Sequence, residues 1–269
     1  MPIIVDLYTP RQSWLHALDP RVKLLFVACF IFLLLFYNNL LFMAGVLTLL
    51  HIMYVSARIP RQKIVFIWKT LLPISLFMAL LRIIFYPVGP LIAQIWLVQI
   101  TPFAIAQGMV LGLRIITMAF VVFAWLYTTA QPVLVRSLVK LGAPYEWGLV
   151  LALALRYIPT FQGTYTLISE AQQARGLDIS MGSGFKRVQV MMPIFVAMII
   201  TSLRSADQLG KALEARALGA PGILRSNLHD IHFQPADYVA AILIIAVTVG
   251  LVYLRLWFGI GIHPINLLG

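Results

Sequence analysis

Charged residues are scarce in this chain. Only 11% of its 269 residues are Asp, Glu, Lys or Arg, whereas 61% are hydrophobic, and the mean hydropathy is +0.94. A soluble globular domain has about 25% charged residues, so this composition argues against a soluble domain and predicts an integral membrane protein. Cysteine is scarcer still, because the single Cys29 lies in an apolar run and cannot form an internal disulfide. We expect its thiol to be packed among apolar neighbours.

The chain also lacks the sequence signatures of common catalytic sites. Gly210-Lys211 is followed by Ala212 where a phosphate-binding loop would need Ser or Thr. The sequence offers no defensible Ser-His-Asp or Cys-His arrangement. His229 and His232, with an aspartate between them, leave a metal site open as an alternative, but we favour a solvated loop at this point of the chain.

Long apolar segments predict where the chain crosses the bilayer. The last three of five reach the roughly 20 residues that a helix needs to span hydrocarbon, while the first two are short and are separated by Asn38-Asn39. These two are either a hairpin of short crossings or one long helix. The hairpin leaves every predicted outer segment without Lys or Arg, whereas one long helix would place the basic loop Ser56–Lys63 outside. The predicted spans are Leu24–Tyr37, Leu40–Val55, Ile64–Tyr86, Phe103–Tyr127 and Tyr238–Phe258.

These patterns predict an all-α integral membrane protein with about five transmembrane helices and a cytoplasmic platform of long amphipathic coupling helices. Residues 1–127 hold the amino-terminal cytoplasmic segment and four spans. Residues 128–236 form the cytoplasmic coupling-helix domain, which carries ten of the twenty basic residues. Residues 237–269 hold the last span and an external tail, so that the amino terminus lies inside and the carboxyl terminus outside.

The coupling-helix domain is expected to contain two long helices. The periodicity predicts one helix from about 145 to 175 and a second from about 185 to 218, the later half of which is amphipathic. The stretch Val188–Leu203 carries no charge, so a sixth span stays open as an alternative. We expect instead that this stretch lies against the bundle near the inner interface, because it is short and is interrupted by Gln189 and Pro193.

An arginine motif occurs twice in this domain. Gln173–Leu177 (QARGL) recurs 41 residues later as Glu214–Leu218 (EARAL). A small residue on each side lets the guanidinium protrude from a helix end and enter a socket on another protein, where its planar fork makes several charge-assisted hydrogen bonds. Two copies indicate two sockets, and hence a dimeric or pseudo-dimeric soluble partner. The predicted coupling residues are Ala174, Arg175, Gly176, Ala215, Arg216 and Ala217.

Further motifs show a family resemblance. The opening Ser13–Leu24 (SWLHALDPRVKL), the segment Leu155–Pro159 (LRYIP) and the run Glu170–Gly176 (EAQQARG), taken with the second arginine motif, resemble the transmembrane T component of energy-coupling factor (ECF) vitamin transporters. The resemblance covers almost the whole chain. Ala217 stands where the family motif most typically has Gly, a change that keeps the flank of the arginine small.

The resemblance implies a non-catalytic scaffold in the cytoplasmic membrane of a prokaryote. Arg175 and Arg216 would each dock into one of two cytoplasmic ABC ATPase subunits. ATP-driven motion of those subunits would tilt the long helices and topple a small membrane-embedded, substrate-binding S component, which releases its vitamin or other micronutrient inward. The chain itself would need no cofactor, because ATP and Mg are bound by the ATPases, and it would bind no nucleic acid.

The long helices also carry a predicted contact face for the S component. Their apolar stretches expose more hydrophobic surface than a solvated loop tolerates, so lipid or protein should cover them. The predicted contact residues are Trp147, Leu151, Leu155, Ile194, Met198 and Ile199.

Other interpretations remain at this point. A conventional ABC importer permease would form its own substrate path, but such permeases usually dock through one short coupling helix per subunit. A membrane-embedded enzyme would need a polar catalytic cluster. Both arginines of the motifs could also be cations that merely stabilise helix ends, by roughly 0.3–1 kcal/mol each. Arg114 lies well inside a predicted span, where it lines a substrate path, pairs with a buried carbonyl or reaches an interface. Asp19-Pro20 is expected to cap and begin the first span.

Overall fold

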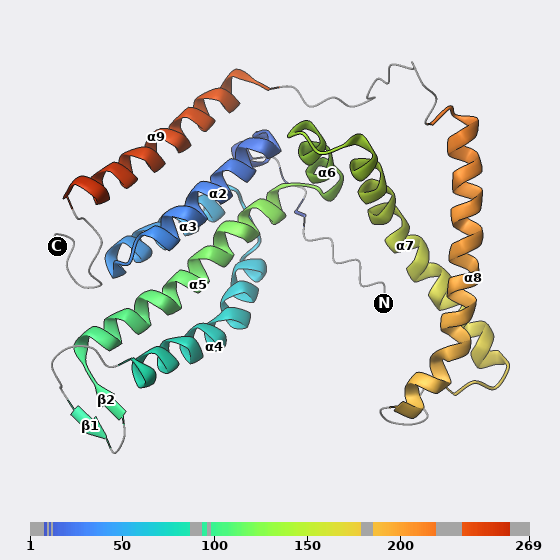
Figure 1. Ribbon diagram of the computed structural model, residues 1–269, viewed down its shortest axis with the longest axis horizontal. Coiled ribbons are helices and arrows are strands. Elements are labelled where there is room, and N and C mark those ends of the chain that lie inside the picture. The colour runs from blue at the N-terminus through green and yellow to red at the C-terminus, as the bar shows by residue number, and fades with distance from the viewer. Residues whose placement is uncertain are drawn as a thin grey trace. The chain divides into compact units, whose positions relative to one another are not determined.

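The chain is almost entirely helical in the computed structural model, which describes residues 8–9, 11, 13–86, 93–95, 98–178, 185–218 and 233–258 (Figure 1). Within these ranges the helices are α1 (Trp14–Ala17), α2 (Pro20–Phe36), α3 (Leu40–Ser56), α4 (Arg61–Phe85), α5 (Pro102–Thr128), α6 (Gln131–Lys140), α7 (Tyr145–Ala174), α8 (Phe185–Ala215) and α9 (Pro235–Phe258). Two three-residue strands, β1 (Ala93–Ile95) and β2 (Val98–Ile100), pair in antiparallel fashion between α4 and α5. The predicted all-α fold is confirmed, and the short strand pair is an additional element that the sequence does not predict.

The helices form two compact units. The bundle unit contains α1 to α6 and α9, and the α7–α8 unit contains the two long helices α7 and α8. The sequence predicts one domain for residues 128–236, which would group α6 with α7 and α8, whereas in the structure α6 clusters with the bundle unit and contacts α2. The assignment of residues 128–236 to the cytoplasmic side stays a prediction.

Four of the described helices are long and apolar enough to cross a membrane, namely α4, α5, α9 and, within α8, Arg187–Ala215. The chain is therefore a multi-pass membrane protein. Ahead of these, α2 and α3 are two separate helices, and the side chain of Asn39 caps α3 by accepting hydrogen bonds from the backbone N–H groups of Leu41 and Phe42. The predicted pair of short helices is thus confirmed over one long helix. Length and composition would let α8 cross the membrane, and its placement near the inner interface stays a prediction.

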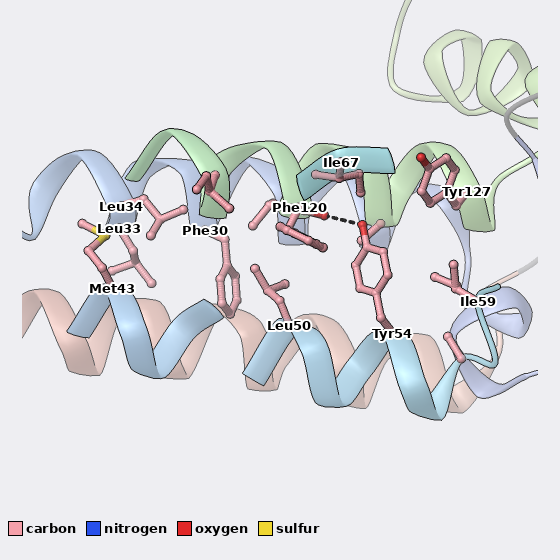
Figure 2. Packing of buried hydrophobic residues seen from close by; sticks show 14 of the residues in the cluster. Phe30, Leu33, Leu34, Met43, Leu50, Tyr54, Ile59, Ile67, Phe120 and Tyr127 are labelled. Atoms are coloured by element: carbon pink, nitrogen blue, oxygen red, sulfur yellow. Dashed lines mark hydrogen bonds between the residues drawn. The ribbon is translucent and has the colours of Figure 1, made fainter. Parts of the chain in front are cut away.

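The core of the bundle unit lies between α2, α3, α4 and α5 (Figure 2). Leu34 of α2 and Met43 of α3 are completely buried. Tyr54 of α3 is also completely buried, and its hydroxyl donates a 2.8 Å hydrogen bond to the backbone carbonyl of Phe120 in α5. Because a buried hydroxyl without a partner would be destabilising, this bond fixes α3 against α5.

Two glycines of α5 set its distance from α4. A Cβ atom on Gly108 would lie 2.9 Å from the backbone carbonyl oxygen of Ala79, and a Cβ on Gly112 would lie 3.2 Å from that of Ser75. Small residues four positions apart allow two helix backbones to approach closely inside a membrane, where packing contacts drive helix association. This pair of glycines therefore holds α4 and α5 together.

The opening motif joins three helices at one end of the bundle unit. Asp19 is the N-cap of α2 and accepts a hydrogen bond from the first turn, while Pro20 occupies the first helical position, which confirms the predicted capping role. The backbone N–H of Asp19 also donates to Asp237 of α9 at 2.8 Å, 218 positions further along the chain. The buried ammonium of Lys23 donates to the carbonyl of Thr128 at the end of α5. The helices α2, α5 and α9 are thereby tied together.

Candidate functional site: two arginine-bearing helix ends

The first arginine motif forms the carboxyl end of α7. The backbone N–H of Gly176 donates to the carbonyl of Gln173 at 2.9 Å, and the N–H of Leu177 donates to the carbonyl of Gln172 at 3.0 Å. Gly176 has a φ of +89°, in the left-handed region. These are the features of a Schellman motif, in which a left-handed residue just past the helix lets two N–H groups satisfy the last carbonyls. Arg175 is the residue directly before this left-handed turn.

The second motif repeats this geometry at the end of α8. The N–H of Ala217 donates to the carbonyl of Glu214 at 2.8 Å, and the N–H of Leu218 donates to that of Leu213 at 2.9 Å. Ala217 has a φ of +56°. The two sequence motifs are therefore the same local structure, with Arg216 in the place that the first arginine occupies on α7.

The backbone conformation gives a further reason for the residue that follows each arginine, whereas the need for a small flank at a partner's socket stays a prediction. A Cβ atom on Gly176 would meet nothing within 4 Å in this chain, so space alone does not require glycine there. The left-handed φ does favour it, because an L-residue with a side chain costs roughly 1–2 kcal/mol in this conformation. Ala217 adopts the same conformation in spite of that cost. The signal that was missed is the glycine-then-leucine pattern after a helix, which is typical of a Schellman motif.

Both arginine side chains are free to meet a partner. Arg175 and Arg216 are exposed, and within the part of the chain that the structure describes neither guanidinium has a hydrogen-bond or ion-pair partner. On α7 the side-chain nitrogen of Gln173 donates to the hydroxyl oxygen of Ser169 at 3.1 Å, and this bond leaves Arg175 uninvolved. The arginines are therefore held at a defined helix end while their charged groups stay unengaged.

The two helix ends lie at opposite ends of the α7–α8 unit. The helices α7 and α8 contact each other and run in opposite directions, so that the end of α7 and the end of α8 point away from each other (Figure 1). With 31 residues, α8 is about 46 Å long at 1.5 Å per residue. Arg216 is therefore about one helix length from the beginning of α8, and each arginine is presented at its own site.

The predicted contact face for the S component contains three exposed residues, two half-buried residues and one buried residue. Trp147 on α7 is 73% exposed and Ile199 on α8 is 60% exposed, and Leu151 is exposed as well. Two further predicted residues, Leu155 and Met198, are half-buried. Ile194 is only 1% exposed, so other parts of this chain already cover it, and its contact with the S component stays a prediction.

No other candidate site emerges in the part of the chain that the structure describes. No group of three or more His, Cys, Asp or Glu side chains suited to a metal ion occurs among the described residues, and His229 and His232 lie outside them. An apolar cavity of about 380 Å³ in the bundle unit is lined by residues from α1, α2, α3 and α9. Its one charged lining residue, Lys23, donates to backbone carbonyls instead of facing a ligand with a free ammonium.

Comparison with known proteins identifies the family of this chain. The model of the CbiQ family, described as cobalt transport protein, matches residues 11–220. The energy-coupling factor transporter transmembrane protein EcfT of Streptococcus equi subsp. equi (strain 4047) is 30% identical over 267 residues, which cover 94% of this chain and 97% of that protein. The protein of the same name from Bacillus subtilis (strain 168) is 30% identical over 230 residues, covering 80% and 84%.

The chain belongs to the CbiQ family. It is a transmembrane component of the energy-coupling factor transporter type, as the motif resemblance predicts. In this CbiQ-family chain the matched residues 11–220 contain the opening motif and both arginine-bearing helix ends, and they stop before α9. The similar proteins are named as transporter components, and their names include no catalytic activity.

Proposed function

We propose that this chain couples two cytoplasmic ABC ATPase subunits to one membrane-embedded S component and so drives uptake of a vitamin or another micronutrient. The observation that carries the proposal is the repeated helix end, at which Arg175 and Arg216 have the same backbone geometry and no partner in the described chain. A single such end would be explained by the favourable placement of a cation near a helix carboxyl terminus. A repeat at opposite ends of one helix pair fits a partner with two equivalent sockets.

In this mechanism the α7–α8 unit transmits motion. Each guanidinium enters a socket on one ATPase subunit and binds acceptor groups there through its planar fork. The helices behave as stiff rods, so when ATP brings the two ATPases together their approach changes the tilt of α7 and α8. The bound ATP and its Mg stay on the ATPases, and this chain contributes no group to hydrolysis.

The apolar surface of the same helices would carry the S component. Exposed side chains such as Trp147, Leu151 and Ile199 form hydrophobic surface of a kind that usually marks contact with protein or lipid. A tilt of the helices would then rotate the S component in the membrane and open its binding site toward the cytoplasm. The substrate would be recognised by that partner and not by this chain.

Replacement of the two arginines tests the proposal. Loss of a guanidinium that is buried at an interface leaves its acceptors unpaired and costs about 2–5 kcal/mol. Arg175→Ala and Arg216→Ala should therefore each weaken ATPase association by about 25-fold or more, and the double variant should be worse than either. Lys at these positions should rescue poorly, because it keeps the charge but loses the fork. Co-purification of the ATPases and uptake into vesicles measure the two effects.

A matched control is Arg204→Ala, which removes an exposed arginine from the middle of α8 and not from a helix end. This variant should bind the ATPases and support uptake like the wild type. Full transport by the Arg175→Ala/Arg216→Ala double variant would return both residues to a purely local role at helix ends.

A further inference from the structure

Two arginines from distant parts of the chain converge at one end of the bundle unit. Arg114 of α5 donates from Nη2 to the backbone carbonyl of Tyr37 at 2.9 Å and to the side-chain oxygen of Asn38 at 3.2 Å. The guanidinium of Arg255 in α9 lies over the rings of Phe36 and Tyr37, at 4.1 and 5.5 Å from their centroids. Both guanidinium groups lie against Tyr37, so two positive groups share the turn that follows α2.

No Asp or Glu side chain among the described residues pairs with these two arginines. The sequence contains no Asp or Glu between Pro20 and Tyr145 and none after Asp237. Within the described part of the chain, Arg114 Nε and Arg255 Nη1 are buried and have no hydrogen-bond acceptor. Uncompensated cations are costly in a membrane. Both side chains are only half-buried as a whole, so an anion from outside the chain can reach them.

The depth of the pair indicates where that anion comes from. At 1.5 Å per residue, Tyr37 lies about 25 Å from the beginning of α2, and Arg255 lies about 30 Å from the beginning of α9. Arg114 lies about 21 Å from the end of α5 that bonds Lys23. The hydrocarbon core is about 30 Å thick, so the pair lies at or just below the headgroup layer. The anionic group that a membrane presents at this level is the phosphate of a phospholipid.

The geometry points to a binding site for the phosphate of one anionic phospholipid between Arg114 and Arg255, in the leaflet at the Asn38 end of the bundle unit. The N–H groups of both guanidinium groups, other than the buried Arg114 Nε and Arg255 Nη1, would donate to the phosphate oxygens. Tyr253 and Trp257 of α9 are exposed and stacked on each other close to Arg255 in sequence. Aromatic side chains of this kind favour the interface between headgroups and hydrocarbon, and they would flank the bound lipid.

The bound lipid would have a local consequence for the membrane. The helices α2 and α3 have 17 residues each and are about 25 Å long, shorter than the hydrocarbon core. A lipid held at the level of Asn38 would let the bilayer thin around this hairpin instead of exposing its polar turn to acyl chains.

Lipid retention tests the site. The transporter complex, purified through this chain, is placed in nanodiscs of phosphatidylglycerol and phosphatidylcholine, and the lipids that stay bound after release are counted by native mass spectrometry. The wild type should retain one phosphatidylglycerol that the Arg255→Gln variant loses. Arg255 makes no hydrogen bond that holds the fold in the described structure, so this variant should keep the assembled complex. Arg114→Gln should lose the lipid too, although it also removes the bonds to the turn.

The matched control is Arg82→Gln, which removes a guanidinium that lies over the ring of Tyr86 near the end of α4, 4.0 Å from the ring centroid. It should retain the lipid as the wild type does. Equal retention by the wild type and the Arg255→Gln variant would overturn the inference. Displacement of the lipid by 10 mM inorganic phosphate, at constant ionic strength, would assign the pair to a free anion and would overturn it as well.

Discussion

At the scale of single residues, the most informative positions are the two that follow the arginines. Gly176 and Ala217 both adopt a left-handed backbone, and each closes the last turn of its helix through the same pair of hydrogen bonds. Alanine is an expensive choice for this conformation, by about 1 kcal/mol relative to glycine. The end of α8 thus adopts the same left-handed turn as the end of α7, although alanine disfavours this backbone conformation.

A pair of opposite substitutions tests this account. Ala217→Gly should stabilise the end of α8 by about 1 kcal/mol, and Gly176→Ala should destabilise the end of α7 by a similar amount. Thermal unfolding of the purified protein, together with the rate of proteolysis after Arg175 and Arg216, measures the two changes. Effects of the same sign in both variants would contradict the assignment of left-handed conformation as the cause.

The sequence is a good guide to these residues but a poor guide to their contacts. The arginines and their small neighbours are visible as a repeat, and Asp19 is recognisable as a helix cap. Its partner Asp237 is not recognisable, because the two residues meet only after α2 and α9 have packed together. The burial of Ile194 was missed for the same reason, since the periodicity of one apolar helix does not show which of its faces is covered.

At the scale of helices, the contact between α4 and α5 depends on the absence of side chains. Gly108→Leu would drive a side chain into the backbone carbonyl of Ala79 and the side chain of Ile83, which lie 2.9 and 3.0 Å from a Cβ at this position. The helices would have to separate, at a cost of about 1–3 kcal/mol or more. We expect reduced yield and a lowered unfolding temperature in detergent. Gly45→Leu is the control, because a Cβ on Gly45 meets nothing within 4 Å, and it should behave like the wild type.

The helices α7 and α8 provide a second prediction at this scale. Ile199→Asp places a charge on an exposed apolar position of α8, and it should release the S component while ATPase binding persists. Ile194→Asp buries a charge instead, so it should destabilise the protein and remove both partners together. Co-purification of each partner with the two variants distinguishes them. Loss of both partners from the Ile199→Asp variant would mean that this position supports the fold and not a contact.

At the scale of the whole molecule, composition and apolar length are enough to predict a multi-pass helical membrane protein, and helix bounds follow within a few residues. The strand pair between α4 and α5 is not predictable in this way, since its segment contains apolar residues without a clear period. The sequence also does not determine whether α8 crosses the bilayer or lies at its surface. Its residues 187–215 are apolar enough to cross a bilayer, yet its charged later half suits a surface.

The orientation of the chain in the membrane is the prediction on which the coupling role depends. Lys and Arg cluster in the segments predicted to lie inside, so single cysteines introduced at Lys63, Arg175 and Arg216 into a Cys29→Ser background should react only after the membrane is made permeable. A cysteine at Asn38 should react, if at all, from the outside. If α8 crossed the bilayer, the positions 175 and 216 would lie on opposite sides and one partner could not hold both arginines. Labelling of position 216 from the outside would therefore exclude the coupling mechanism. Protection of both arginine positions in intact cells would instead support it, because both helix ends would then lie in the cytoplasm, where the ATPases bind ATP.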